Sequence, residues 1–375
     1  MAVSESIITF SIISVTVPVI LLSLFARRLR PRQEISLTED LRRSFSRGLS
    51  VLPFHTIRRY FEPRPIESIL SSNRFRGQRD HLCVPVSYDE LCSGYWICKG
   101  PPGNPQQPKR SDLVLLWFHG GAYCFGGPSA PAVSFLRVAE LAAAEGISMS
   151  IFSARYTLAP EAKFPRQQHE AVAAYRYLLE AEDIPADRIV IGGESAGGHL
   201  TLACLMDLVE EGLPKPGGAL LFYPWVNLKN SSPSFKINGH KDILSKRLLE
   251  RCVKAAAGER KRLDKFDFVD FTRPRPFRGQ RTWKDILPAS TWVNIGAHDI
   301  LLHDVRTFVE RAKDDGACVE LQVLSGMTHF WNFYLDMPSE DKYCALQPEE
   351  TIPVGMMTGS ESVAEGVFTL WATRA

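Results

Sequence analysis

One serine in the stretch GGESAGGHL (residues 192–200) has the surroundings of an enzyme nucleophile. Ser195 lies between Gly193 and Gly197, after the apolar run RIVIG and before an apolar stretch with helical spacing. A sharp strand-to-helix turn needs such small neighbours, and the helix that follows adds partial positive charge where an oxyanion would form. The pattern G-x-S-x-G alone arises by chance in roughly one chain of this length in ten. A glycine-rich turn with a capping serine is therefore the alternative unless partners are present.

A serine hydroxyl becomes a nucleophile when an imidazole accepts its proton and a carboxylate fixes the tautomer of that imidazole. Asp299 follows the strand-like run at 291–296, and His329 follows the run at 319–323. Both residues then stand in loops after later strands, in the chain order serine, acid, histidine. The sequence predicts a catalytic triad of Ser195, Asp299 and His329.

Neighbouring residues compete for the same roles. Asp304 is expected to be a structural acid, and His199 to pack along the helix that follows the serine. His298 and His303 flank the predicted acid but precede the last strand. Cys124 has no neighbouring basic residue that would hold it as a thiolate, so we do not expect it to be the nucleophile.

A glycine loop supplies the remaining requirement, a site for the developing oxyanion. His119, Gly120, Gly121 and Ala122 directly follow the buried run LVLLWF. Glycines let the backbone turn its N–H groups toward a negative charge, and Ala196, the residue after the nucleophile, offers a further donor. We expect the N–H groups of Gly120, Gly121, Ala122 and Ala196 to form the oxyanion hole, with His119 bracing the loop. A phosphate-binding loop is the alternative, but the sequence lacks the G-K-[ST] that would follow it.

Apolar runs and helical patterns alternate from about residue 112 onward, which favours an α/β fold with a mostly parallel sheet and helices on both faces. Expected strands lie at 113–118, 147–153, 188–192, 218–222, 291–296 and 319–323, and expected helices at 134–146, 169–182 and 196–209. Residues 225–287 break this rhythm with Lys, Arg, Pro and Phe and contain one clear helical pattern, at about 246–257. We expect this segment to be an insertion over the sheet.

Composition excludes several classes of protein. The chain has 375 residues, is 45% hydrophobic and carries a formal charge of +2, which argues for a sizeable core and against a nucleic-acid partner. Its eight cysteines show no C-x-x-C pair and no histidine at zinc spacing, so we expect mostly reduced core thiols and no metal site, with a disulfide in a luminal body as the alternative.

Residues 7–26 contain no charge, and 20 residues of helix span about 30 Å, the thickness of a bilayer's hydrocarbon core. We expect a single transmembrane helix here, with a cleaved signal peptide or a buried helix as alternatives. Four arginines follow it (Arg27, Arg28, Arg30 and Arg32), which places the catalytic body in the cytosol, most simply at the endoplasmic reticulum. A sequon at 230–232 keeps a luminal body open as the alternative.

Three motifs together resemble those of the hormone-sensitive-lipase branch of the α/β-hydrolases, which includes arylacetamide-deacetylase-like and fungal sterol-deacetylase-like esterases. They are HGGA (119–122), YTLAPE followed by FP (156–165) and GESAGG (193–198), and the predicted acid and histidine complete them. The resemblance runs from about residue 112 to 335. It implies a metal-free and cofactor-free serine esterase of hydrophobic esters, with a helical cap built from the N-terminal region and the insertion. The sequence departs from the family where Ala122 replaces a frequent third glycine and where Arg155 precedes the tyrosine of the second motif.

The predicted organisation is a membrane anchor with a basic flank (1–30), a linker and N-terminal cap region (31–111), and an α/β-hydrolase domain (112–375) with a cap insertion at about 225–287. The predicted function is a serine carboxylesterase or deacetylase acting on small hydrophobic esters. Alternatives are a tailoring hydrolase of a fungal-type natural-product pathway, a peptidase or thioesterase with the same triad, and a ligand-binding receptor on a hydrolase scaffold. The cap phenylalanines either line an apolar pocket or pack in the cap (Phe266, Phe268, Phe271 and Phe277). The sequence pattern assigns neither an oligomeric state nor a role to residues 336–375.

Overall fold

A computed structural model of the protein describes residues 18, 21–22, 25, 36–101, 103–258, 263, 265–273 and 280–373. The predicted transmembrane segment at 7–26 lies outside the described residues except at four positions, and the arginines at 27–32 and Phe277 lie outside them as well. Within the described ranges, no helix combines the length and the apolar character that crossing a bilayer requires.

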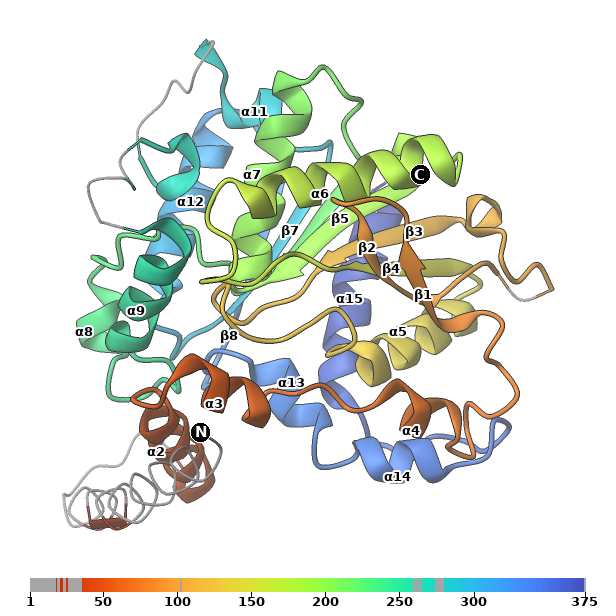
Figure 1. Cartoon of the computed structure of the whole chain (residues 1–375), viewed down its shortest axis with the longest axis horizontal. Helices are drawn as coiled ribbons and strands as arrows, with labels where there is room; N and C mark the ends of the chain where they lie inside the picture. Colours follow the sequence, from red (N-terminus) through yellow and green to blue (C-terminus); the bar gives the residue numbers. More distant parts are fainter. Residues whose placement is uncertain are drawn as a thin grey trace.

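A sheet of eight strands runs through the centre of the described chain (Figure 1). The strands are β1 (Leu82–Ser87), β2 (Ser93–Cys98), β3 (Leu113–Phe118), β4 (Met149–Ala154), β5 (Ile189–Glu194), β6 (Gly218–Phe222), β7 (Thr291–Gly296) and β8 (Val319–Leu324). Their order is β1-β2-β4-β3-β5-β6-β7-β8, with β1–β2 and β2–β4 antiparallel and the other neighbours parallel. The strands β3, β4, β6 and β7 are buried at every residue, which explains why apolar side chains predominate in them.

The six predicted strands are present, with bounds within two residues of the expected ones. The predicted domain boundary at residue 112 is wrong, because β1 and β2 belong to the sheet and precede it. These two strands give a weak signal because they lie at the antiparallel edge, where the last four residues of β1 alternate between half-buried and exposed and include Pro85. The hydrolase sheet therefore begins at Leu82, inside the segment assigned to the linker and cap.

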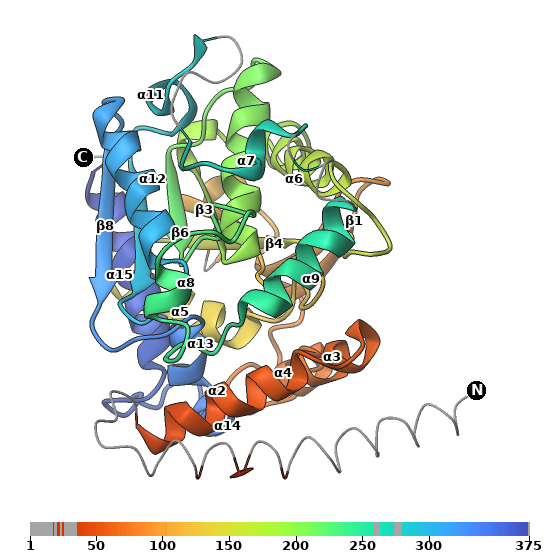
Figure 2. The same ribbon diagram turned by 90° about the vertical axis from the view of Figure 1, so that its left-hand side faces the viewer.

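Helices cover both faces of the sheet (Figures 1 and 2). α5 (Ala132–Ala144) and α15 (Thr358–Ala372) pack together on one face, and α6 (Arg166–Arg176), α7 (Ala196–Glu210) and α12 (Leu302–Asp314) cover the other. The predicted helix at 169–182 is divided, since α6 ends at Arg176 and a π-helical turn follows over Tyr177–Ala181. Short helices complete the connections: α4 (Ile66–Leu70), α11 (Trp283–Ile286), α13 (Trp331–Asp336) and α14 (Glu340–Ala345).

The C-terminal segment, which the sequence pattern left unassigned, belongs to the core. α15 contacts β6 and β7, and it approaches them closely at Gly366. A Cβ atom at Gly366 would lie 2.8 Å from a Leu220 methyl group and 2.9 Å from the Trp292 ring. Glycine at this position therefore lets the last helix lie directly against the sheet.

The N-terminal helices and the insertion lie side by side (Figure 2). α2 (Leu37–Leu49) and α3 (Phe54–Tyr60) come from the N-terminal region, and α8 (Ser234–Ile237) and α9 (Lys246–Ala257) from the insertion. Arg251 of α9 joins them, because its guanidinium donates to the carbonyls of Ser50 and Leu52 and lies over the Phe54 ring. The helix expected at 246–257 is confirmed with these bounds.

Candidate active site

Ser195 stands at a tight turn between β5 and α7. Its backbone adopts φ 52° and ψ −114°, a left-handed conformation that is unusual for a residue other than glycine. A Cβ atom at Gly197 would lie 1.9 Å from the carbonyl oxygen of Phe118, and one at Gly193 would lie 2.4 Å from the carbonyl carbon of Gly197. The turn thus requires the two flanking glycines and presents the serine at the carboxyl end of the strand.

The structure brings the three predicted triad residues together. Nε2 of His329 lies 2.8 Å from Oγ of Ser195, and Nδ1 of His329 lies 2.7 Å from Oδ2 of Asp299. The other carboxylate oxygen of Asp299 accepts a hydrogen bond from the N–H of Leu301 at 2.8 Å. Asp299 can only accept while it is ionised, so Nδ1 of His329 carries the proton and Nε2 is free to accept the serine proton. This tautomer is the one that a general base requires.

Burial and charge act in opposite directions on His329. Complete burial on its own would lower the pKa of this imidazole, but Asp299 opposes it through charge and a hydrogen bond, and Asp242 and Glu194 add to that effect. The net result is a pKa of His329 above its ordinary value. Nearby negative charge therefore favours the protonated ring that forms when the serine gives up its proton.

The glycine loop after β3 lies beside Ser195, but one of the N–H groups predicted to bind the oxyanion already donates a hydrogen bond within the protein. The N–H of Gly120 donates to Oε1 of Glu194 at 3.2 Å, so the predicted oxyanion role of Gly120 is not supported. The loop turns sharply beyond it, with φ 105° at Gly121 and φ 51° at Ala122. The backbone N–H groups of Gly121, Ala122 and Ala196 are left as the candidate oxyanion donors.

His119 has the surroundings of a bracing residue. Its Nδ1 lies 2.7 Å from the carbonyl oxygen of Gly120, and its ring stacks on that of Tyr156 with centroids 4.2 Å apart. The hydroxyl of Tyr156 donates to the carbonyl of His119 at 2.8 Å. Burial lowers the pKa of His119 to about 4, so the ring is neutral near pH 7.

A half-buried carboxylate beside the loop was not identified from the sequence. Glu194, the residue before Ser195, accepts hydrogen bonds from the N–H of Gly120 and from the hydroxyl of Tyr223 at 2.9 Å. The same hydroxyl lies 2.6 Å from Oδ1 of Asn332. Burial raises the pKa of Glu194. The only sequence signal for this residue was its place in the GESAGG motif.

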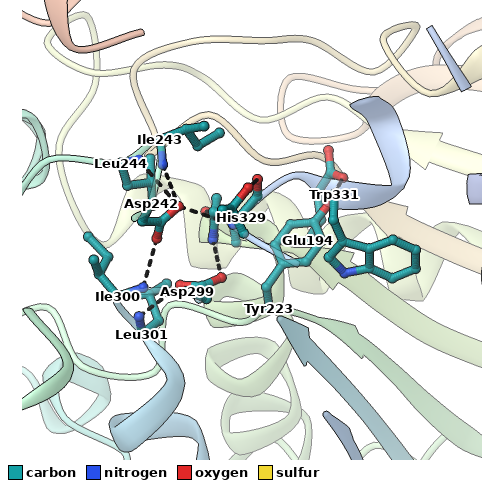
Figure 3. A network of polar contacts seen from close by, with 12 residues as sticks. Glu194, Tyr223, Asp242, Ile243, Leu244, Asp299, Ile300, Leu301, His329 and Trp331 are labelled. Atoms are coloured by element: carbon teal, nitrogen blue, oxygen red, sulfur yellow. Dashed lines mark hydrogen bonds and ion pairs between the residues drawn. The ribbon is translucent and has the colours of Figure 1, made fainter. Parts of the chain in front are cut away.

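Asp242, from the insertion, is a second carboxylate that sequence reasoning missed. It is fully buried and lies beside Asp299 and His329 (Figure 3). Its oxygens accept hydrogen bonds from the backbone N–H groups of His329 (3.1 Å) and Ile300 (2.7 Å). Nothing in the local sequence, GHKDILS, distinguishes this aspartate from a solvated one.

The competing residues occupy structural positions. His199 is buried with Nδ1 2.6 Å from the hydroxyl of Tyr123 and Nε2 2.9 Å from the carbonyl of Phe268, and burial lowers its pKa to about 3. Asp304 is buried and accepts a hydrogen bond from Asn227 at 3.3 Å. Cys124 is a buried free thiol.

The cap phenylalanines pack against one another and against the helix that follows the serine. The rings of Phe266 and Phe268 stack with centroids 4.9 Å apart, and Phe271 is fully buried beside His199 and Trp283. These contacts agree with the packing alternative for the described phenylalanines.

Comparison with known proteins agrees with this geometry. Residues 115–333, more than half of the chain, match the model of an α/β-hydrolase fold family. An acetyl-hydrolase of Streptomyces hygroscopicus is 29% identical over 297 residues, which cover 77% of this chain and 88% of the relative. The hormone-sensitive lipase of Mus musculus is 32% identical over 158 residues, 41% of this chain and 20% of the lipase, so the match spans one fifth of that longer protein.

A solved structure shows the same architecture. The crystal structure of an esterase from the bacterial hormone-sensitive lipase family superposes with a TM-score of 0.61 at 24% identity, covering 95% of this chain and 97% of the esterase. Fold, motifs and relatives lead to one conclusion: the chain belongs to the α/β-hydrolase fold family, in its hormone-sensitive-lipase-like branch.

Proposed function

We propose that the protein is a serine-dependent carboxylic ester hydrolase. The observation that carries this proposal is the continuous chain of hydrogen bonds from Ser195 Oγ through His329 to Asp299. Oγ of Ser195 attacks the ester carbonyl while Nε2 of His329 takes its proton, and Asp299 holds the imidazolium in place. His329 then gives this proton to the departing alcohol, which leaves an acyl-serine.

Water completes the reaction along the same path. His329 removes a proton from the water, hydroxide attacks the acyl-serine, and the acid leaves as Ser195 recovers its proton. The N–H groups of Gly121, Ala122 and Ala196 stabilise the oxyanion in both halves. Loss of one such donor typically costs about 10²- to 10³-fold in kcat, so the loop after β3 is part of the proposed catalytic machinery.

For the substrate we propose acetyl or other short acyl esters of hydrophobic alcohols. The similarity to an acetyl-hydrolase, which covers 77% of this chain and 88% of that relative, supports a small acyl group. The apolar stretch at 7–26, if it anchors the chain in a membrane with the body on the cytosolic side, would bring the enzyme to alcohols that partition into lipid. Alkaline carbonate extraction of membranes tests this anchor: retention in the pellet supports it, and release of the full-length chain contradicts it.

The proposed activity is tested with full-length protein, p-nitrophenyl acetate and a fluorescent fluorophosphonate. Wild type should hydrolyse the ester and become covalently labelled, whereas Ser195→Ala should do neither. Ser153→Ala is a matched control, because Ser153 is a buried serine of β4 whose hydroxyl has no hydrogen-bond partner among the described residues. It should label like wild type. A folded wild-type protein that neither labels nor turns over contradicts the proposed function.

A further inference from the structure

A short segment of the insertion connects the two loops that carry Asp299 and His329. Residues 238–242, here called the strap, follow α8 and end at Asp242. Oδ1 of Asp242 accepts from the N–H of His329 at 3.1 Å, and Oδ2 accepts from the N–H of Ile300, the residue after Asp299, at 2.7 Å (Figure 3). One carboxylate therefore holds both loops at a fixed separation.

The other end of the strap holds the acid loop as well. Nδ2 of Asn238 donates to the carbonyl of Ala297 at 3.0 Å and to the carbonyl of Asp299 at 2.8 Å. The strap thus binds the backbone of the acid loop on both sides of the Asp299 side chain. Neither Asn238 nor Asp242 touches the hydroxyl of Ser195, so both act through other residues.

The conformation of Asp242 is itself constrained. Its Oδ1 also accepts from the N–H groups of Ile243 at 2.7 Å and Leu244 at 3.4 Å, which closes a turn at the end of the strap. A carboxylate that accepts several backbone N–H groups has little freedom to rotate, and removing it would leave those buried donors without a partner. The bonds to the two catalytic loops are therefore preorganised.

Helix α2 holds the strap from the opposite side. Arg47 donates to the carbonyl of Gly239 and, at 3.5 Å, to that of Asp242, and Arg43 donates to the carbonyl of His240. Arg43 is in turn paired with the buried Asp40 on the same helix. Hydrogen bonds therefore run from α2 to the strap, and from the strap to the loops that carry Asp299 and His329.

The charge of Asp242 also faces the triad. Burial and the neighbouring Asp299 raise the pKa of Asp242, while His329 and the backbone donors of Ile300 and His329 act to lower it. The charge of Asp242 in turn raises the pKa of His329, which also faces Asp299, Glu194 and the ring of Tyr223. Asp242 also raises the pKa of the nearby Tyr334 phenol, whose ring packs against the guanidinium of Arg42 in α2.

We propose that the strap positions the triad of the ester hydrolase: Asp242 and Asn238 fix the acid and base loops at the separation that Ser195 requires, and the Asp242 charge adds to that of Asp299 in stabilising protonated His329. This role deepens the proposed function and rests on it. Asp242 and Asn238 are positioning residues, since they contact the catalytic loops rather than the reacting atoms.

The test compares Asp242→Asn with Asp336→Asn in the full-length protein. Asp336 is a matched control because it is a buried carboxylate that accepts from the N–H groups of Gly359 and Ser360 and from the hydroxyls of Ser134 and Ser360, at the start of α15. Steady-state ester hydrolysis over a range of pH gives kcat, KM and the acid limb of kcat/KM. Thermal unfolding reports whether each variant is folded.

Asp242→Asn is expected to lower kcat by about 10- to 10²-fold with little change in KM, and to move the acid limb to lower pH. The direction follows because His329 must be neutral to act as a base, and removal of a nearby negative charge lowers its pKa. Asp336→Asn should lower the unfolding temperature and leave kcat and the acid limb in place. A folded Asp242→Asn enzyme with wild-type kcat, or with reduced kcat and an unmoved acid limb, overturns the proposal.

Asn238→Ala tests the proposal if Asp242→Asn does not fold. This variant removes the hydrogen bonds from the strap to the carbonyls of Ala297 and Asp299 without changing any charge. It should reduce kcat several-fold and leave the acid limb in place, and wild-type kcat in this variant would overturn the strap. These results are distinct from failure of the proposed function, which would show as a folded wild type that neither labels with fluorophosphonate nor hydrolyses the ester.

Discussion

Oε1 of Glu194 accepts a hydrogen bond from the N–H of Gly120, so the residue before the nucleophile holds the loop that is expected to bind the oxyanion. Replacement of Glu194 by Ala removes this brace and leaves the Tyr223 hydroxyl without its carboxylate partner. We expect kcat to fall by about 10- to 10²-fold, because a small displacement of an oxyanion donor is costly.

Glu194→Gln provides the comparison, since its amide oxygen can still accept from Gly120. It should retain more activity than Glu194→Ala in the same p-nitrophenyl acetate assay. Equal activity of the two variants would show that the hydrogen bond to the loop is unimportant.

The pH dependence of ester hydrolysis should report His329. Burial alone would lower the pKa of His329. The negative charges of Asp299, Asp242 and Glu194 more than offset this effect, so the net pKa lies above the ordinary 6.5. Since the neutral ring is the base, kcat/KM should be low in acid and rise with pH, with the midpoint of the acid limb above 6.5. An acid limb centred at pH 5 would contradict the balance of charges described here.

Loss of Asp299 should disable the base without unfolding the site. Asp299→Asn can no longer act as a carboxylate acceptor for Nδ1 of His329, and its amide would favour the wrong tautomer of the ring. We expect kcat to fall by about 10⁴-fold, the magnitude known for the equivalent change in another serine hydrolase. Asp304→Asn, in a neighbouring buried acid that lies outside the triad, should stay within about 10-fold of wild type in kcat. Similar losses in both variants would argue that Asp299 has a structural role only.

The turn at Ser195 should not tolerate a side chain at Gly197. A Cβ atom there would lie 1.9 Å from the carbonyl oxygen of Phe118 and 2.6 Å from that of His119, and backbone atoms cannot rotate away as a flexible side chain can. Gly197→Ala should therefore abolish fluorophosphonate labelling and lower the unfolding temperature. Gly127→Ala is the control, because its Cβ atom would meet only Pro63 at an ordinary 3.7 Å. Normal labelling of Gly197→Ala would mean that the turn is less tight than described.

Arg251 should couple the insertion to the N-terminal helices. Arg251→Met keeps most of the side-chain length but loses the hydrogen bonds to Ser50 and Leu52 and the charge over the Phe54 ring. We expect a loss of about 1–3 kcal/mol in the free energy of unfolding, measured by urea denaturation. Arg176→Met is the control, since Arg176 pairs with two exposed acids and should cost less than about 1 kcal/mol. Equal losses in the two variants would argue against a specific junction at Arg251.

The sequence by itself determined the features that depend on local pattern. Parallel strands buried on both faces are predominantly apolar, so the sequence pattern placed β3, β6 and β7 to the residue. The tight turn around Ser195 is marked in the sequence by its two flanking glycines. The order of Ser195, Asp299 and His329 after successive strands was also visible, because in a parallel sheet the carboxyl ends of the strands meet at one edge.

Only the tertiary structure decided the features that depend on distant partners. β1 and β2 form the antiparallel edge of the sheet, where β1 pairs with β2 and β2 with β4, and the mixed pattern of β1 does not distinguish it from loop. The use of the Gly120 N–H by Glu194 joins residues 74 positions apart, and Asp242 binds the N–H of Ile300 and of His329, 58 and 87 positions away. A backbone N–H is present at every residue except proline, so the sequence carries no mark of which one a buried carboxylate will bind. That choice is made only when the sheet and the cap are packed together.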